Sequence, residues 1–431
     1  MKRRTRYLLI ILGFIFFLIT APLIVLYVGG ITYDFDQNRY VKTGILVVNT
    51  DPTGAKLFIN DLPEGSTPKR VKFLKPGEHT VTLSKTGYFP WTKRLEIKSE
   101  KATWTAVGVD NVHLIKNELN IKNLATDAVD FEFTNDGLIY LTTKQVVFIK
   151  DDKINVNNNL ALPKPVNKIQ MSPNKQLALL SGDEAMLLLE VNSKKFYELT
   201  SLRNPTSLLE FSSTNELFHL DQGTLSKVNW EDSTLNPITT DVTAFKTAEN
   251  SIYILEDDEP NKSTLQVFPR NTDPSQAQTL TSNVTRFNKP KLLVTKNKEI
   301  FILGDGTVYK VNNELTKVAD SVIGWQYISD TNSLMFISPS ELNHYDFSNG
   351  TTELISRSSN SFMAPLLETN IGYTFFGQNS ELLALELDRR DVQNSYSLMQ
   401  NVELKKILST SNARFLYLLS NNSLLKLTIR D

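Results

Sequence analysis

The sequence predicts an all-β protein held behind one transmembrane helix, and three observations lead to this fold class. An apolar run opens the chain, short alternating patterns fill the remainder, and from about residue 112 onward these patterns recur at a spacing near 40 residues. Alternation of apolar and polar residues is typical of half-buried strands, whereas helices repeat apolar positions every three or four residues. We therefore expect a transmembrane helix, then a small β-sandwich, then a β-propeller of eight, or alternatively seven, blades.

The helix is predicted from a 22-residue apolar run, from Tyr7 to Val28, that contains no charged residue. At about 1.5 Å per residue it reaches roughly 33 Å, enough to cross a hydrocarbon core of about 30 Å. Four cations stand directly before it: Lys2, Arg3, Arg4 and Arg6. By the positive-inside rule, residues 1–6 form a cytoplasmic stub and everything after residue 28 lies outside the cell membrane.

A cleaved secretory signal is the competing interpretation of this run. The apolar region of such a signal spans about 7–15 residues and is followed by a small-x-small cleavage site. Here the run is longer, and the bulky Leu26-Tyr27-Val28 stands where small residues are needed. These features favour an uncleaved single-pass anchor, which makes the membrane the first expected partner.

Composition limits the chemistry of the 431 residues. There is no Cys and there are only four His, which excludes disulfides, thiol catalysis, zinc–thiolate sites and iron–sulfur sites. Once the four N-terminal cations are set aside, 42 basic residues face 47 acidic ones. A nucleic-acid partner is not expected, because it requires a basic patch.

A linker over residues 29–43 is followed by alternating sequence over residues 44–105. Turn-forming pairs such as Pro76-Gly77 and Thr86-Gly87 separate the apolar stretches. The predicted strands cover residues 45–48, 56–59, 80–83 and 94–97. Four or five short strands in about 60 residues indicate a small antiparallel sandwich or barrel.

Several motifs of this segment occur in the order and spacing of a known family. They are Gly44 to Ala55, Phe58-Ile59-Asn60-Asp61, Gly65-Ser66-Thr67-Pro68, Leu74 to His79, Lys85-Thr86-Gly87-Tyr88 and Trp91. This arrangement resembles the PEGA domain, whose Pro-Glu-Gly-Ala reads here as Pro52-Thr53-Gly54-Ala55. The resemblance implies a prokaryotic, extracytoplasmic spacer or adhesion-like module and no catalysis.

Three residues of this segment invite a functional interpretation. Tyr88 and Trp91 are expected to fill the small core, and the competing role is a sugar-stacking surface. His79 is expected to be a structural residue at a strand edge, because a lone His is a poor metal site.

Residues 112–431 repeat one unit of short strands separated by polar turns. The units begin near Val129, Lys168, Leu208, Ala244, Lys291, Gln326, Leu367 and Lys406. A period near 40 built from four strands is typical of propeller blades. The turn Ser172-Pro173-Asn174-Lys175 resembles the Ser-Pro-Asp-Gly turn of bacterial propellers with periplasmic or surface locations. An array of β-sandwiches would need longer strands and linkers between domains.

Ring closure can also be predicted. The last unit, residues 406–431, holds three strands, so a fourth is needed from elsewhere in the chain. Residues 112–115 or 118–121, before the first unit, are the two candidates. Either would join the two ends of the ring and remove its exposed edges.

No catalytic, cofactor or metal residue is predicted. Nucleophile-elbow, phosphate-loop and zinc-protease motifs do not occur. His219 and His344 fall inside expected strands, and the acidic cluster 256–259 reads as a solvated hairpin tip between strands rather than a Ca²⁺ site. Asn-x-Ser/Thr triplets occur at Asn261, Asn283, Asn349 and Asn421.

Two functions remain open on the sequence alone. The first is a non-catalytic, membrane-tethered extracytoplasmic protein whose propeller presents a surface to a protein, glycan or cell-wall partner. The alternative is an extracytoplasmic propeller enzyme that acts on glycans at the central channel. A signalling receptor is disfavoured, because six residues before the helix cannot form an output domain.

Overall fold

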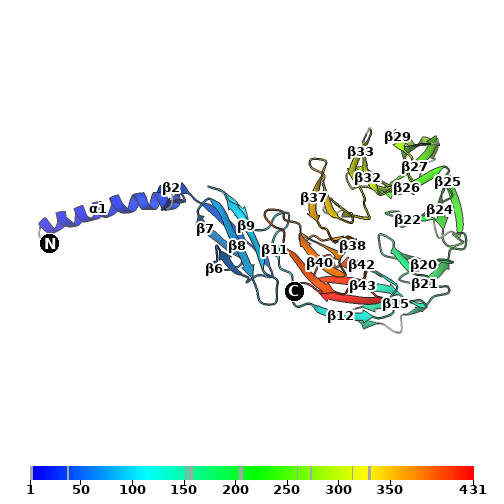
Figure 1. Cartoon of the computed structure of the whole chain (residues 1–431), viewed down its shortest axis with the longest axis horizontal. Helices are drawn as coiled ribbons and strands as arrows, with labels where there is room; N and C mark the ends of the chain where they lie inside the picture. Colours follow the sequence, from blue (N-terminus) through cyan, green and yellow to red (C-terminus); the bar gives the residue numbers. More distant parts are fainter. Residues whose placement is uncertain are drawn as a thin grey trace.

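The protein is described here from a computed structural model that covers residues 3–35, 38–150, 153–154, 159–202, 207–259, 261–271, 274–312, 314–328 and 332–431. Three parts follow one another along its long axis: a helix, a small β domain and a ring of sheets (Figure 1). The all-β fold class with one N-terminal helix is therefore confirmed.

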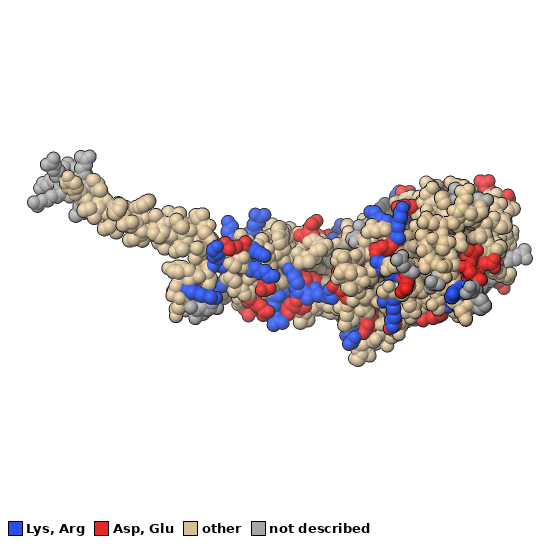
Figure 2. Space-filling view, turned by 90° about the horizontal axis from the view of Figure 1, so that it is seen from above, with Lys and Arg blue, Asp and Glu red and all other residues tan. Residues whose placement is uncertain are grey.

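Helix α1 (Arg3–Val28) contains a 19-residue stretch, Ile10–Val28, that is apolar enough to cross a membrane. Its described side chains lie outside any protein core, and no charge shows on its coloured surface in Figure 2. A helix that is apolar all round and exposed is stable in lipid rather than in water. This helix is compatible with a membrane anchor or a signal sequence.

The predicted linker contains a hairpin that its polar residues had concealed. Strand β1 (Ile31–Asp34) pairs antiparallel with β2 (Arg39–Lys42), so that Tyr33 lies opposite Tyr40. The β-branched and aromatic residues of these two segments favour strands.

The small β domain is a sandwich of two sheets. One sheet has the order β6 (Leu62–Ser66), β5 (Lys56–Ile59), β8 (Gly77–Ser84) and β9 (Trp91–Ile97). The other has the order β10 (Ala102–Trp104), β3 (Gly44–Val48) and β7 (Lys69–Leu74). Buried residues alternate strictly along β9, as the pleat of a half-buried strand requires. The sandwich was predicted, but β6, β7 and β10 were missed because their charged or short sequences lack that alternation.

Seven successive antiparallel sheets form blades 1–7 of the ring, with the first strand of each blade innermost. The sheet of blade 1 has five strands and each of the other six has four. Blade 1 consists of β13 (Asp130–Phe133), β14 (Leu138–Leu141), β15 (Gln145–Lys150) and β16 (Lys153–Ile154), and β17 (Leu160–Ala161) also pairs with β15. Blade 2 consists of β18 (Lys168–Met171), β19 (Leu177–Ser181), β20 (Met186–Glu190) and β21 (Lys195–Glu198). Blade 3 consists of β22 (Leu208–Phe211), β23 (Leu217–Asp221), β24 (Thr224–Asn229) and β25 (Thr234–Thr239).

Blades 4–7 continue in the same order. Blade 4 consists of β26 (Val242–Ala248), β27 (Ser251–Glu259), β28 (Lys262–Pro269) and β29 (Gln278–Thr285), with a short 3₁₀ helix at Pro274–Gln276, and blade 5 of β30 (Lys291–Val294), β31 (Ile300–Gly304), β32 (Thr307–Val311) and β33 (Leu315–Ala319). Blade 6 consists of β34 (Gly324–Ile328), β35 (Ser333–Ile337), β36 (Glu341–Asp346) and β37 (Thr351–Arg357). Blade 7 consists of β38 (Phe362–Glu368), β39 (Tyr373–Gln378), β40 (Glu381–Glu386) and β41 (Ser395–Gln400).

Blade 8 combines the two ends of the ring. Strand β12 (Asn120–Ala125) lies outside β44 (Ser423–Thr428), which is followed inward by β43 (Phe415–Ser420) and β42 (Leu404–Ser409). The described residues thus form eight blades, and the closing strand overlaps the expected segment 118–121. The other candidate was wrong: β11 (Val112–His113) pairs in parallel with β4 (Thr50–Asp51) of the small domain, because the chain is still leaving that domain there.

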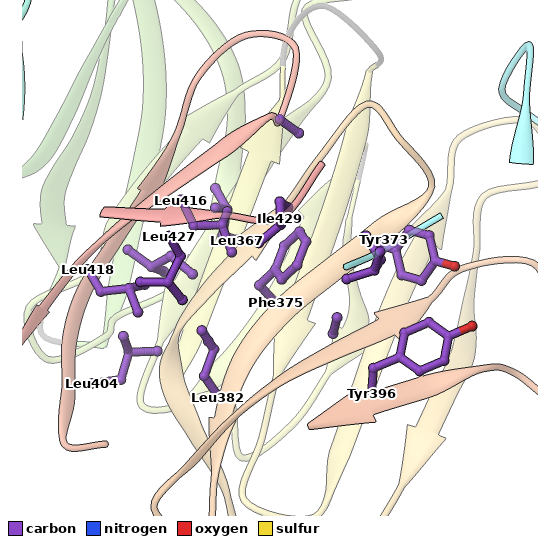
Figure 3. Packing of buried hydrophobic residues seen from close by; sticks show 14 of the residues in the cluster. Leu367, Tyr373, Phe375, Leu382, Tyr396, Leu404, Leu416, Leu418, Leu427 and Ile429 are labelled. Atoms are coloured by element: carbon purple, nitrogen blue, oxygen red, sulfur yellow. The ribbon is translucent and has the colours of Figure 1, made fainter. Parts of the chain in front are cut away.

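Apolar clusters between neighbouring blades hold the ring together. Figure 3 shows the cluster between blades 7 and 8, where Leu367, Phe375 and Leu382 meet Leu404 and Leu418. A further cluster joins blade 8 to blade 1 and completes the circle. Each middle strand is packed on both faces, which is why these strands read as continuous apolar runs rather than as alternating ones.

The turn recognised at Ser172 recurs between the first and second strands of other blades. The Ser172 hydroxyl accepts a hydrogen bond from the backbone N–H of Leu177 at 3.0 Å, and Lys175 adopts a φ of 59°. Turns 212–215, 295–298 and 410–413 repeat both features with a Ser or Thr hydroxyl and a left-handed fourth residue. Only the turn at Ser172 has the Ser-Pro pair that made it recognisable in the sequence; the other three turns have Ser, Lys or Ser at the second position.

Candidate functional site

The small β domain is joined to the ring by buried polar side chains of strand β9. Trp91 and Lys93 are both 0% exposed. The Trp91 Nε1–H donates to Glu386 Oε1 at 2.7 Å, and Lys93 Nζ lies 3.2 Å from Glu386 Oε2. Lys93 also donates to the carbonyl of Asp388 at 2.6 Å. Trp91 and Tyr88 belong to the domain core, as predicted, and the indole N–H of Trp91 is satisfied across the junction.

A second group of contacts surrounds this buried centre. The Arg94 guanidinium holds Asp391, with 2.8 Å between its Nη2 and Oδ1, and lowers the pKa of that carboxyl well below its usual range. Arg390 donates to the carbonyls of Trp104 and Thr105, each at 2.8 Å. Because these contacts lie on different strands of the domain, they fix its orientation against blade 7.

Arg430 and Asp431, which follow β44 of blade 8, supply a third group of contacts. Arg430 Nη1 lies 2.9 Å from Asp51 Oδ2, and Lys116 Nζ lies 2.5 Å from Asp431 Oδ1. The Tyr88 hydroxyl donates to Asp431, and burial together with this carboxylate raises the pKa of Tyr88 well above its usual range. The junction therefore joins the domain to blades 7 and 8 together.

A crevice of about 670 Å³ lies beside the junction, between the segment 105–113 and blades 6 and 7. Burial lowers the pKa of both His113 and His344 there. Arg389 is paired with Glu353, and Arg390 with Asp388, so the charged side chains compensate one another. We assign this crevice to the junction rather than to a ligand site.

The two faces of the ring follow from strand direction. In each antiparallel blade, the first strand begins, the second ends and the third begins on one face, which we call the front face. The junction uses Glu386 at the end of a third strand and Tyr396 at the start of a fourth, so it lies toward the opposite, back face. In Figure 1 the small domain meets the rim at blades 7 and 8, across the ring from blades 3 and 4.

An open hollow of about 1120 Å³ lies on the front face over blades 3–5, and we call it the front hollow. Its walls are the turns before β26 and β30 and those within the hairpins β23–β24, β27–β28 and β31–β32. Its charged and amide side chains are Asp221, Asp241, Asp257, Asp305, Arg286, Lys289, Lys291, Gln222, Asn261 and Asn288, beside the ring of Phe287.

The charges of the front hollow are partly paired. Arg286 Nε lies 2.7 Å from Asp257 Oδ2, and the Ser263 hydroxyl donates to the same carboxylate at 2.7 Å. Next to it, burial and then the charges of Asp258 and Asp241 raise the pKa of Glu256. Mixed carboxylates, amides and cations of this kind bind hydroxyl-rich or polar ligands through several hydrogen bonds.

Carboxylates on the innermost strands serve to join blades. Lys406 Nζ lies 2.9 Å from Asp130 Oδ1 and 2.7 Å from Glu132 Oε1. Asp130 also accepts the backbone N–H of Ile169 in blade 2 at 2.8 Å. In blade 3, Glu210 likewise accepts from Lys246 Nζ in blade 4, at 3.1 Å.

The histidines named from the sequence are dispersed. His79 lies 3.0 Å from Asn60 Nδ2 through Nδ1 and 2.8 Å from the Lys75 carbonyl through Nε2, in the structural role expected of it. His219 is buried in β23, and its Nε2 makes no hydrogen bond with the described residues. His344 contacts the Ser333 hydroxyl at 3.0 Å.

The acidic cluster 256–259 lies at the tip of the β27–β28 hairpin, as predicted, but it belongs to β27 rather than to a segment between strands. Its residues still pair with β28, since Asp257 lies opposite Ser263 and Glu259 opposite Lys262. No group of three His, Asp or Glu suited to a metal occurs among the described residues. Of the Asn-x-Ser/Thr sites, Asn261 borders the front hollow, Asn349 and Asn421 lie in exposed turns, and the Asn283 side chain lies outside the described residues.

The front hollow was missed because its residues come from five turns in three blades, none with a distinctive local sequence. The sequence feature that could have indicated the hollow is an acidic residue that recurs beside these turns, as at Asp241 and Asp305. The sequence likewise gave no sign that Trp91 meets Glu386, which lies 295 residues away.

Comparison with known proteins supports the two-part architecture. Residues 43–111 match the PEGA domain family. No curated protein matches the sequence. Among solved structures, the C-terminal WD40 domain of Sif2 aligns with 72% of this chain and 99% of its own length at 10% identity and a TM-score of 0.55.

Two further solved structures are similar to this chain. A eukaryotic initiation factor aligns over 68% of this chain and 81% of its own length at 11% identity and a TM-score of 0.51. Virginiamycin B lyase from Staphylococcus aureus aligns over 72% of this chain and 99% of its own length, with 12% identity and a TM-score of 0.45. The likenesses to the Sif2 domain and to the initiation factor show the fold alone. The chain therefore consists of an N-terminal apolar helix, a PEGA domain and a β-propeller.

Proposed function

We propose that this is a single-pass, membrane-tethered protein whose propeller lies outside the cytoplasm and binds a protein, glycan or cell-wall partner without catalysis. The observation that carries the proposal is the buried junction of Trp91 and Lys93 with Glu386. A flexible tether would need no such contacts. A fixed junction gives the propeller a defined orientation relative to α1.

The place of the front hollow supports the same function. The junction uses blades 7 and 8 toward the back face, whereas the hollow spans blades 3–5 on the front face. In Figure 1 blades 3 and 4 lie at the end of the molecule farthest from α1. A partner that approaches from outside would meet the hollow first, and loops on a rigid scaffold are common sites of binding.

A binding role also fits the carboxylates of the innermost strands. Glycoside hydrolysis needs two carboxyl groups free to act on a substrate. Asp130, Glu132 and Glu210 are instead paired with Lys406 or Lys246 across blade boundaries.

Site-directed photo-crosslinking in living cells tests the binding role. Benzoyl-phenylalanine at Asn261, which borders the front hollow, is expected to give a crosslinked product with a protein or glycan. The matched control is Glu231, an exposed residue of the same region whose turn between β24 and β25 faces the back. Products of equal yield from both positions, or from Glu231 alone, would contradict the proposal.

An activity screen tests the claim that no reaction is catalysed. The purified full chain should leave a panel of envelope glycans unchanged in length and reducing ends. Turnover that disappears in the variant Glu132→Gln or Glu210→Gln would instead establish the propeller enzyme.

A further inference from the structure

Exposed aromatic rings gather in a patch next to the helix, on the hairpin of β1 and β2. Phe35 is 79% exposed and Tyr40 is 64% exposed. The ring of Tyr33 lies between them, with centroid distances of 5.0 Å to Phe35 and 5.2 Å to Tyr40. A cluster of exposed aromatic rings of this kind is unfavourable in water and marks a contact surface.

The patch is held against the end of α1 by the hairpin itself. Both the backbone N–H and the hydroxyl of Thr43 donate to the carbonyl of Gly30, at 2.8 and 2.6 Å. Tyr27, in the last turn of α1, packs against Phe73 of β7 with centroids 4.9 Å apart. The helix, the hairpin and the edge of the PEGA domain are therefore contiguous.

The length of α1 places this patch at a definite depth. The 19 residues Ile10–Val28 rise about 28 Å, close to a hydrocarbon core of about 30 Å. A hairpin that starts three residues later begins where the core ends, and its four-residue strands reach about 13 Å. The headgroup layer lies within this reach, and Tyr rings, with an apolar body and a polar tip, are enriched there.

The charged side chains near the patch are compatible with the headgroup layer, because the carboxylates are paired with lysines and an arginine is exposed. Asp34, which is buried in β1, is neutralised by Lys75 Nζ at 2.7 Å. Lys42 is paired with Glu100 at 2.7 Å. Arg39 is exposed directly before Tyr40, where its guanidinium can reach lipid phosphate.

We propose that Tyr33, Phe35 and Tyr40, together with Tyr27 and Phe73, insert into the headgroup layer of the bilayer that α1 crosses. This interaction rests on the proposed tether and goes beyond it, because it makes the PEGA domain lie on the membrane surface. Two attachments, one by α1 and one by the patch, prevent the domain from tilting freely. The occupant is the phospholipid bilayer, and a second copy of the chain is the competing one.

Fluorescence quenching in proteoliposomes tests the insertion, and the absence of native Cys makes single-site labelling simple. An environment-sensitive fluorophore is attached at Phe35→Cys, or at Arg39→Cys, which leaves every aromatic ring in place. Full-length protein is reconstituted in vesicles that contain headgroup nitroxide lipids. Emission from both labels is expected to fall by roughly half or more, because the labels lie in the headgroup layer.

Two further labels separate the outcomes. Val392→Cys, at a side chain 75% exposed on blade 7, should stay unquenched, and Phe16→Cys in α1 should be quenched by acyl-chain nitroxides. Quenching at Phe16 but not at Phe35 or Arg39 would overturn the insertion and leave the tether standing. No quenching at Phe16 would overturn the tether and the insertion together. Emission at Phe35 that responds to protein dilution instead of nitroxide would assign the patch to a second copy.

Discussion

At the junction of the PEGA domain and the propeller, Lys93 is a charged side chain that water would normally surround. It is fully buried and lies 3.2 Å from Glu386 Oε2, while the other oxygen of this carboxylate accepts from Trp91. Burying an ion pair is costly, so a buried pair is stable only when good geometry and additional hydrogen bonds compensate its desolvation. The carbonyl of Asp388 supplies one of these bonds to Lys93.

Replacing Lys93 by Met is expected to destabilise the protein by about 3–5 kcal/mol, because it leaves Glu386 buried and unpaired. The double variant Lys93→Met, Glu386→Gln should recover part of this loss, since no full charge then stays buried. Urea denaturation followed by tryptophan fluorescence measures the free energies of unfolding. Strictly additive losses would show that the two side chains are not coupled.

The buried His219 makes the free energy of unfolding depend on pH. Burial lowers its pKa in the folded protein, so the unfolded chain takes up the proton first as the pH falls through about 6.5. The free energy of unfolding must therefore decrease on acidification, and burial acts in the same direction on His113 and His344. His219→Leu should make the decrease between about pH 7 and about pH 5.5 smaller than in the native protein. Equal pH dependence in denaturation curves of the two proteins would refute this assignment.

Among the elements, β12 has the largest structural consequence for its length. It pairs with β44 and carries Leu124 into the cluster that joins blade 8 to blade 1. The strand thereby links the beginning of the propeller to its last three strands. Pairing with β12 covers β44, which would otherwise be the exposed edge of a three-stranded blade.

Leu124→Ala is expected to lower the free energy of unfolding by about 2–5 kcal/mol, because it leaves a cavity between blades 8 and 1. Ile121→Ala is the matched control on the same strand, since Ile121 is largely exposed and should change stability by under about 1 kcal/mol. Thermal unfolding monitored by circular dichroism compares the two. Equal effects would mean that β12 does not close the ring through its buried face.

Elements with clear periodicity were predictable, and those defined by distant partners were not. Each predicted blade start lies within five residues of the first residue of an innermost strand, because the spacing of turns is a local property of the sequence. The closing strand could be narrowed only to two candidates, since both 112–115 and 118–121 have strand-like sequence and only their pairing distinguishes them. The front hollow and the pairing of Trp91 with Glu386 depend on how blades assemble, which no local pattern encodes.

At the scale of the whole molecule, α1, the PEGA domain and the propeller follow one another along one axis (Figure 1). The PEGA domain separates the helix from the ring, and its junction on blades 7 and 8 leaves blades 3 and 4 at the distal end. Charged side chains of both signs lie on the visible face of the PEGA domain, beside the uncharged stretch Ile10–Val28 of the helix (Figure 2). This division matches a lipid-embedded part and a hydrated part.

Cysteine labelling in intact cells tests the central claim, that the front hollow is displayed outside the membrane, most directly. Asn261→Cys borders the hollow and Thr5→Cys precedes the apolar run, in a chain with no other Cys. A membrane-impermeant maleimide is predicted to modify Asn261→Cys in intact cells and Thr5→Cys only after permeabilisation. Modification of Thr5→Cys in intact cells, with Asn261→Cys protected until lysis, would contradict this account.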